Sequence, residues 1–120
     1  MKEKLLIHTV NEAYSFDPKH IISIEADGNY CNLHLSNGND YLLSFQLGQI
    51  EKMILSQLGS DGNIFIRIGK SLIINRSFIS YINIPKQKLT LSDVATFSHT
   101  VTASKEALRE LKELIEDETR

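Results

Sequence analysis

The basic and polar residues that could bind a charged partner stand at turns between apolar runs. The clearest case lies between Phe65 and Ile82, where Gly69-Lys70-Ser71 interrupts a nearly continuous run of strand-forming side chains. Such a run is typical of buried strands, and lysine is among the residues least often buried. We therefore expect the chain to turn outward at Gly69 and to direct Lys70 to solvent or to a partner.

Further candidate contact residues stand at other expected turns and at the start of the last expected helix. They are Asn29, Tyr30, Ser71, Arg76, Ser104 and Lys105. Lys105 is unusual because a cation in the first turn opposes the helix dipole, at a cost of about 0.3–1 kcal/mol. The N–H groups of that turn favour an anion such as phosphate. The alternative is a solvated lysine that is tolerated at this small cost.

Catalytic and metal-binding patterns give no positive signal. The four histidines are scattered, and there is no His-x-x-x-His pair, Cys-x-x-Cys pair, Gly-x-Ser-x-Gly motif or glycine-rich phosphate loop. Glu25 and Asp27 flank a turn and are expected to face solvent. His34 and His99 are expected to be exposed strand residues. The sequence therefore predicts a protein that is not an enzyme and that uses no cofactor and no metal ion.

Length and composition predict one globular domain over residues 1–120. The chain is 42% hydrophobic and 23% charged, which suits a continuous core and argues against disorder. A single cysteine, Cys31, cannot form an internal disulfide and fits a reducing cytosol. No stretch approaches the roughly 18 apolar residues of a membrane span, and no signal peptide is evident. We expect a cytoplasmic protein.

The charge is unevenly distributed along the chain. The formal net charge is −2, and residues 103–120 hold four basic and six acidic residues. Residues 1–102 hold nine of each sign. The body is therefore neutral, and net charge alone does not indicate a nucleic-acid partner.

Alternation of apolar and polar residues with a period of two dominates the chain and predicts a mainly β fold. Turn sequences such as Asp27-Gly28-Asn29 and Asn37-Gly38-Asn39 recur at intervals of about 8–12 residues, which is typical of antiparallel sheets. No internal repeat, linker or low-complexity segment interrupts this pattern.

Two segments change to a helical period. An internal helix that Gly59 would end has one apolar face, formed by Leu47, Ile50, Ile54 and Leu58. A C-terminal helix for which Ser104 is a good N-cap carries the apolar stripe Leu108, Leu111 and Ile115.

Four segments follow one another in a distinctive order: IISIEADGNYCNLHLSNGNDY, the internal helix, FIRIGKSLIINRSFISYI, and a hairpin that ends in VTASKEAL. This order resembles the LytTR family of bacterial transcription-regulator DNA-binding domains, from about Lys4 to Leu114. The most specific part is RIGKSLIIN, residues 67–75, which is similar to the family pattern Arg-x-His-Arg-Ser-x-x-Val-Asn. The resemblance implies an elongated, mainly β arrangement of antiparallel sheets, with one short internal helix and one C-terminal helix.

The resemblance also implies that loops at one edge of the β structure contact double-stranded DNA, without a recognition helix. The first loop carries Asn29 and Tyr30, the second is the turn at residues 69–71, and the third is the Ser104-Lys105 pair. Lys105 replaces the arginine of the family, so a point charge stands where a bidentate group is usual. Gly69 replaces a frequent histidine.

We expect the basic residues to bind phosphate and the neutral polar residues to read base edges. Lys70, Arg76 and Lys105 are the expected phosphate contacts. Asn29 and Tyr30 are the expected base contacts, and Lys105 fits either role.

Other conspicuous residues are expected to be structural. Arg67 matches the family motif, and the alternative is a structural role in which it projects from the outer face of its strand or pairs with an acidic residue. Asn75 is expected to bond to backbone at a turn, and Cys31 to fill the core. Four apolar residues of the same run are expected to be buried: Ile66, Ile68, Leu72 and Ile74.

The sequence thus predicts a sequence-specific DNA-binding domain of a bacterial transcription regulator, the output domain of a two-component response regulator. The alternative is a β-rich protein-interaction module that uses exposed edge strands and the acidic C-terminal helix. No receiver or sensor domain is encoded in the 120 residues. We therefore expect an input on another chain, a stand-alone regulator, or a domain cut from a longer chain. We expect binding to paired direct repeats and a monomer or weak dimer in solution, with no membrane partner.

Overall fold

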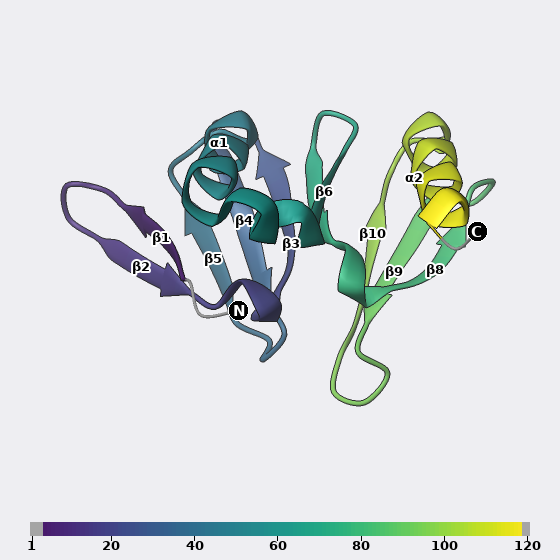
Figure 1. Cartoon of the computed structure of the whole chain (residues 1–120), viewed down its shortest axis with the longest axis horizontal. Coiled ribbons are helices and arrows are strands. Elements are labelled where there is room, and N and C mark those ends of the chain that lie inside the picture. The colour runs from purple at the N-terminus through teal and green to yellow at the C-terminus, as the bar shows by residue number, and fades with distance from the viewer. Residues whose placement is uncertain (1–3, 119–120) are drawn as a thin grey trace.

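The computed structural model describes residues 4–118, which form three antiparallel sheets and two α-helices (Figure 1). A small N-terminal sheet pairs β1 (Leu5–His8) with β2 (Ala13–Phe16). The central sheet has the order β5-β4-β3-β7-β6. Its strands are β3 (Ile21–Asp27), β4 (Tyr30–Leu35), β5 (Asp40–Leu43), β6 (Phe65–Ile68) and β7 (Leu72–Asn75).

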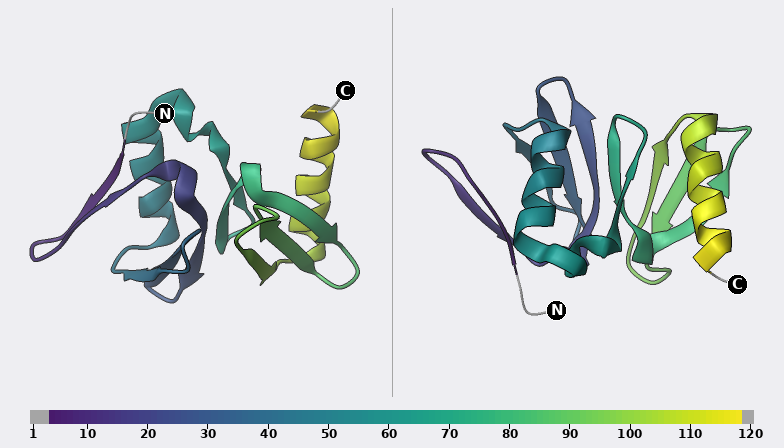
Figure 2. Two further views of the ribbon diagram at one scale, coloured as in Figure 1. Left: turned by 90° about the horizontal axis from the view of Figure 1, so that it is seen from below. Right: turned by 45° about the horizontal axis from the view of Figure 1, so that its top comes forward.

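The C-terminal sheet has the order β10-β9-β8 and lies beside the central sheet (Figures 1 and 2). Its strands are β8 (Ile79–Asn83), β9 (Lys88–Ser92) and β10 (Ser98–Thr102). Three short 3-10 helices connect the elements: η1 (Pro18–His20), η2 (Gly59–Ile64) and η3 (Arg76–Phe78). The described chain measures 43 × 31 × 27 Å, so the elongated, mainly β fold is confirmed.

The two helices cover different hydrophobic cores. Helix α1 (Leu47–Leu58) packs on the central sheet, and its apolar face is buried as expected. It ends at Gly59, which has a φ of +55° and donates its N–H to Leu55 O. Helix α2 (Lys105–Glu118) packs over β6 and β8, and Ser104 Oγ caps it by accepting the N–H of Ala107 at 3.1 Å. The expected helices and both of their caps are confirmed.

The unbroken apolar run around β7 is explained by two cores that share this strand. Ile73 points into the core under α1, whereas Leu72 and Ile74 point into the core under α2. Strand β3 also contributes to both cores. Ile24 belongs to the core under α1, which we call the first core, and Ile22 belongs to the core under α2, the second core. Strands that are covered on both faces have few polar positions.

Four apolar residues between Phe65 and Ile82 were predicted to be buried, and the prediction is confirmed for three of them. Ile68, Leu72 and Ile74 are buried. Ile66 is only half-buried, so the prediction of its full burial is wrong. Ile66 packs at the margin of the core under α2 and lines a shallow depression between β6 and α2.

Candidate nucleic-acid interface

Three of the expected contact segments lie at one edge of the molecule. The β3–β4 turn, the β6–β7 turn and the start of α2 all stand at the upper edge in Figure 1, and Figure 2 shows the same side by side arrangement. Ala26 N, at the end of β3, donates to Ser71 O at 2.8 Å and so ties the first turn to the second. Lys70 and Ser104 line one shallow depression together, which places the second segment beside the third. We call these three segments the contact edge.

The β3–β4 turn presents two polar side chains to solvent. Asp27 pairs with Tyr30 across the hairpin, and Gly28 adopts a φ of +62° that favours glycine. Asn29 is exposed, and Tyr30 is 47% exposed. The only contact of the Asn29 amide among residues 4–118 is a long one, 3.5 Å from its Oδ1 to Gln46 Nε2. Its two N–H donors and one lone pair of its oxygen therefore remain available to a binding partner.

Arg67 on β6 stabilises the β6–β7 turn through two polar contacts. Its Nη2 donates to Lys70 O at 2.9 Å, and its Nη1 pairs with Glu51 Oε1 on α1 at 2.9 Å. Gly69 has a φ of +58°, and a Cβ added there would lie 3.7 Å from Ala107 Cβ on α2. Lys70 and Ser71 are exposed. Arg67 thus pairs with an acidic residue, as one of the expected alternatives has it, and it also bonds to the backbone from which Lys70 projects.

The third segment combines a helix cap with a cation. Ser104 Oγ accepts the N–H of Ala107, which leaves its own hydroxyl hydrogen free to donate. Lys105 is the first residue of α2 and is exposed. The helix N-terminus and the lysine therefore offer positive charge at the same place.

A fourth basic segment at this edge was missed from the sequence. The β8–β9 turn is joined to the end of β10 because Ala103 N donates to Gln87 O at 3.2 Å and Thr102 pairs with Lys88. Lys86 and Lys88 are exposed. The turn at Pro85 was visible in the sequence, but its position beside the start of α2 depends on sheet pairing that the local pattern does not specify.

Acidic residues lie among these cations. Glu106 and Glu110 on α2 line the same depression as Lys70 and Ser104. Both glutamates are exposed. The contact edge therefore has mixed charge, because the acidic C-terminal helix begins there.

Arg76 is separated from the other expected contact residues. It begins η3 at the far end of β7, about 13 Å along the strand from the β6–β7 turn. Its Nη1 pairs with Oε1 of Glu118 near the end of α2. The structure does not bring Arg76 to the contact edge.

Asn75 and Cys31 have the structural roles that the sequence indicated. Asn75 is 1% exposed; its amide donates to Ile21 O at 3.0 Å and accepts from Ser77 N at 2.9 Å. Cys31 is fully buried in the first core, and burial raises the pKa of its thiol.

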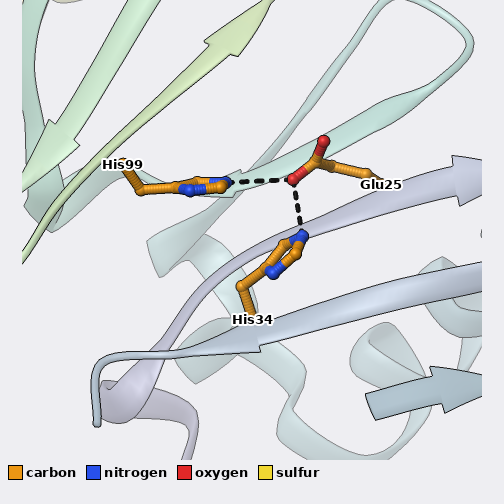
Figure 3. Close-up of side chains that lie close together, drawn as sticks. All are labelled: Glu25, His34 and His99. Carbon is orange, nitrogen blue, oxygen red and sulfur yellow. Dashed lines mark hydrogen bonds and ion pairs between the residues drawn. The ribbon is translucent and has the colours of Figure 1, made fainter. Parts of the chain in front are cut away.

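A polar cluster outside the contact edge joins the central and C-terminal sheets (Figure 3). Glu25 Oε2 lies 2.7 Å from His34 Nε2 and 3.1 Å from His99 Nε2. Hydrogen bonding to His34 and then to His99 lowers the pKa of Glu25 to about 2, although burial opposes this shift. Hydrogen bonds to Glu25 and Asp40 raise the pKa of His34 to about 8 against the effect of desolvation.

Three predictions about this cluster are therefore wrong. Glu25 does not simply face solvent, and His34 and His99 are half-buried partners instead of exposed strand residues. Asp40 stands directly opposite His34 across β4 and β5, a pair that the hairpin at residues 36–39 could have indicated. No sequence signal brings His99 to Glu25, because the two residues lie on different sheets. Asp27, as expected, is exposed.

Comparison with known proteins supports the fold. The chain is similar to the LytTr DNA-binding domain of a protein described as a methyl-accepting/DNA response regulator from Bacillus cereus. The TM-score is 0.62 at 16% sequence identity, and the match covers 96% of this chain and 98% of the other. This likeness concerns the fold.

Two further findings concern sequence and membrane insertion. No curated protein sequence gives a significant match to the chain. Neither helix within residues 4–118 has the length and apolar character needed to cross a bilayer.

A family model identifies the chain. The model of the LytTr DNA-binding domain matches residues 11–116, which include all the turns of the contact edge. The resemblance stated from the sequence is thereby confirmed. The chain belongs to the LytTR family of DNA-binding domains.

Proposed function

We propose that this domain binds double-stranded DNA in a sequence-specific manner through its contact edge, as the output domain of a bacterial transcription regulator. The observation that carries this proposal is that the three segments of the contact edge, which come from different parts of the chain, present exposed polar and basic side chains side by side. These side chains are Asn29, Tyr30, Lys70, Ser71, Ser104 and Lys105. Family membership favours this function over the protein-interaction module.

The side chains divide into two groups: those proposed to bind phosphate, which we call anchors, and those proposed to contact base edges, which we call readers. Lys70 projects from a braced turn as a flexible point charge, which suits a phosphate and distinguishes bases poorly. Ser71 and Ser104 can donate hydroxyl hydrogens to phosphate. Asn29 carries an amide that can donate to and accept from one base edge, and Tyr30 can pack on a thymine methyl group or a sugar.

Lys105 and the β8–β9 turn extend the anchor set. Lys105 lies at the helix N-terminus, where a phosphate is favoured, and it also fits a guanine acceptor. Lys86 and Lys88 stand beside the start of α2, and we add them to the proposed phosphate contacts. The phosphate contact of Arg76 stays a prediction from the sequence. Its ion pair with Glu118 would have to break before Arg76 could reach DNA.

We further propose that two copies bind paired direct repeats and that the free domain is a monomer or a weak dimer. A receiver or sensor on another chain, or on a longer chain that includes this domain, would supply the input; the alternative is a stand-alone regulator. We expect the domain to act in the cytoplasm, where bacterial DNA lies. A tight dimer in sedimentation at micromolar concentration would argue against this scheme.

The first experiment is selection of bound duplexes from a random pool. A sequence-specific domain enriches a motif, and a protein-interaction module does not. Affinity for the enriched duplex and for a scrambled duplex is then measured at three salt concentrations, because phosphate contacts make the affinity depend on salt.

The variants separate the proposed roles. Lys70→Ala and Lys86→Ala should each weaken both duplexes alike and reduce the salt slope by about 1. Asn29→Ala should cost about 1–3 kcal/mol on the enriched duplex only. Lys19→Ala is the matched control, since this exposed lysine lies in η1 at the opposite end of β3. Equal losses on both duplexes for Asn29→Ala, or an unchanged slope for Lys70→Ala, would contradict the assignment.

Arg76→Ala and Lys105→Ala are the informative remaining cases. If Arg76 is held by Glu118 away from DNA, the salt slope of Arg76→Ala should equal that of the wild type. Lys105→Ala should lower the slope on both duplexes if it binds phosphate, and should remove discrimination at one guanine if it reads a base.

A further inference from the structure

Three side chains from two sheets converge on one point away from the contact edge. Glu25 on β3 and His34 on β4 belong to the central sheet, whereas His99 on β10 belongs to the C-terminal sheet. Figure 3 shows both imidazole rings directing a nitrogen at the same carboxylate oxygen. The three ligand-type atoms all lie within 4.8 Å of one another.

The spacing of these atoms is close to that of a metal coordination sphere. Zinc binds histidine nitrogen at about 2.0–2.1 Å and carboxylate oxygen at about 2.0–2.2 Å, so neighbouring ligands of a tetrahedron are roughly 3.3 Å apart. Glu25 Oε2 is 2.7 Å from His34 Nε2 and 3.1 Å from His99 Nε2. The two histidine nitrogens lie within 4.8 Å of each other and would have to approach to about 3.3 Å for all three atoms to bind one ion.

Neighbouring groups support such an arrangement. Asp40 Oδ1 lies 2.6 Å from His34 Nδ1, and a metal-bound histidine commonly donates its second N–H to a carboxylate. Ser23 Oγ donates to Glu25 Oε2 at 3.4 Å. A bound cation displaces the proton that His34 shares with Glu25, and the cluster then has the two negative charges of Glu25 and Asp40, which match the charge of one divalent cation.

The cluster is partly open to water. The exposed fractions of the side chains of His34, Glu25 and His99 are 18%, 33% and 31%. An ion can therefore enter from solvent, and a water molecule can complete its coordination. At the same time, the ligands are half-covered and come from strands whose positions the two sheets fix.

We propose that Glu25, His34 and His99 bind one divalent transition-metal ion of the Zn²⁺ type, with Asp40 as the residue that positions His34. Two imidazoles and one carboxylate are ligands that zinc accepts. The bound ion joins β3 and β4 to β10 and so clamps the central sheet to the C-terminal sheet. This site is independent of the role of the contact edge in DNA binding.

The test uses Zn²⁺ and the untagged full chain. Calorimetric titration should show one ion per chain, and Zn²⁺ should raise the unfolding temperature, since a ligand that binds the folded state stabilises it. Asp40→Asn should weaken Zn²⁺ binding about 10- to 100-fold, and His99→Ala and Glu25→Gln should weaken it more. The matched control is His8→Ala, which removes an exposed histidine on β1 and should bind as the wild type does.

Co²⁺ provides a readout that does not depend on the stability of a variant. The wild type should develop the visible absorption of tetrahedral Co²⁺, and Zn²⁺ should abolish it at one equivalent. The assignment is wrong if the wild type binds neither ion stoichiometrically. It is also wrong if folded His99→Ala binds Zn²⁺ as tightly as the wild type, and the cluster is then an ion-paired link between the sheets.

Discussion

Arg67→Met tests whether the braced β6–β7 turn, or a direct DNA contact, explains the presence of arginine at this position. The substitution keeps much of the apolar stem and removes both polar contacts of the guanidinium. The ion pair with Glu51 has partly exposed partners, with side chains 29% and 42% exposed, so we assign it about 0.2–1 kcal/mol. The hydrogen bond to Lys70 O comes from a charged group and contributes about 1.5–3 kcal/mol.

One effect opposes these losses. Arg67 Nε is buried and has no hydrogen-bond partner among the described residues. Removing an unsatisfied buried group of this kind recovers at least about 1 kcal/mol. We therefore expect Arg67→Met to lower the free energy of unfolding by about 1–3 kcal/mol, as measured by urea denaturation.

DNA binding gives the decisive measurement for Arg67. A turn that is less ordered must be ordered on binding, and about 1.4 kcal/mol of such ordering raises the dissociation constant tenfold. The salt slope should stay at the wild-type value, because Arg67 contacts no phosphate. Glu51→Gln is the control: it removes the ion pair, keeps the bond to Lys70 O, and should leave DNA affinity unchanged. A slope that falls by about 1 in Arg67→Met would mean that Arg67 is itself a phosphate contact.

The structure supports three further predictions. Ile74 is fully buried, so Ile74→Ala should cost about 2–5 kcal/mol in urea denaturation, and a loss below about 1 kcal/mol would contradict its central position. Asn75→Ala leaves Ile21 O and Ser77 N without their buried or half-buried partner and should cost about 2–4 kcal/mol by the same assay. Glu106→Gln removes a negative charge beside the anchors and should tighten binding to any duplex about twofold at low salt, with the gain lost at high salt; weaker binding would show that Glu106 itself contacts DNA.

The features that local chemistry determines were predictable from the sequence. The hairpin that presents Asn29 follows from a glycine turn between two alternating strands, and Gly59 and Ser104 mark helix ends by their residue types. Lys70 was identified because a charged side chain in an apolar run needs an outward turn. Each of these inferences depends on residues that are close together in the sequence.

The features that the sequence did not predict depend on how separate elements pack. His99 meets Glu25 only because β10 lies beside β3 and β4 in space, although these strands belong to different sheets. Lys86 comes near Lys105 through pairing between β9 and β10. Ile66 is half-buried because it lies at the margin of the core under α2, and the packing of α2 on β6 is not visible in the alternation of a single strand.

The strands β3 and β7, which contribute side chains to both cores, make the two halves of the domain dependent on each other. A fragment that ended at residue 75 would leave Leu72 and Ile74 without the C-terminal sheet and α2 that cover them. A fragment that began after β7 would lack the wall on which α2 and β9 pack. We therefore expect the chain to unfold in a single cooperative transition, with amide protons of β3 and β7 exchanging only through global opening. Neither of these two fragments would then fold by itself into a smaller DNA-binding unit.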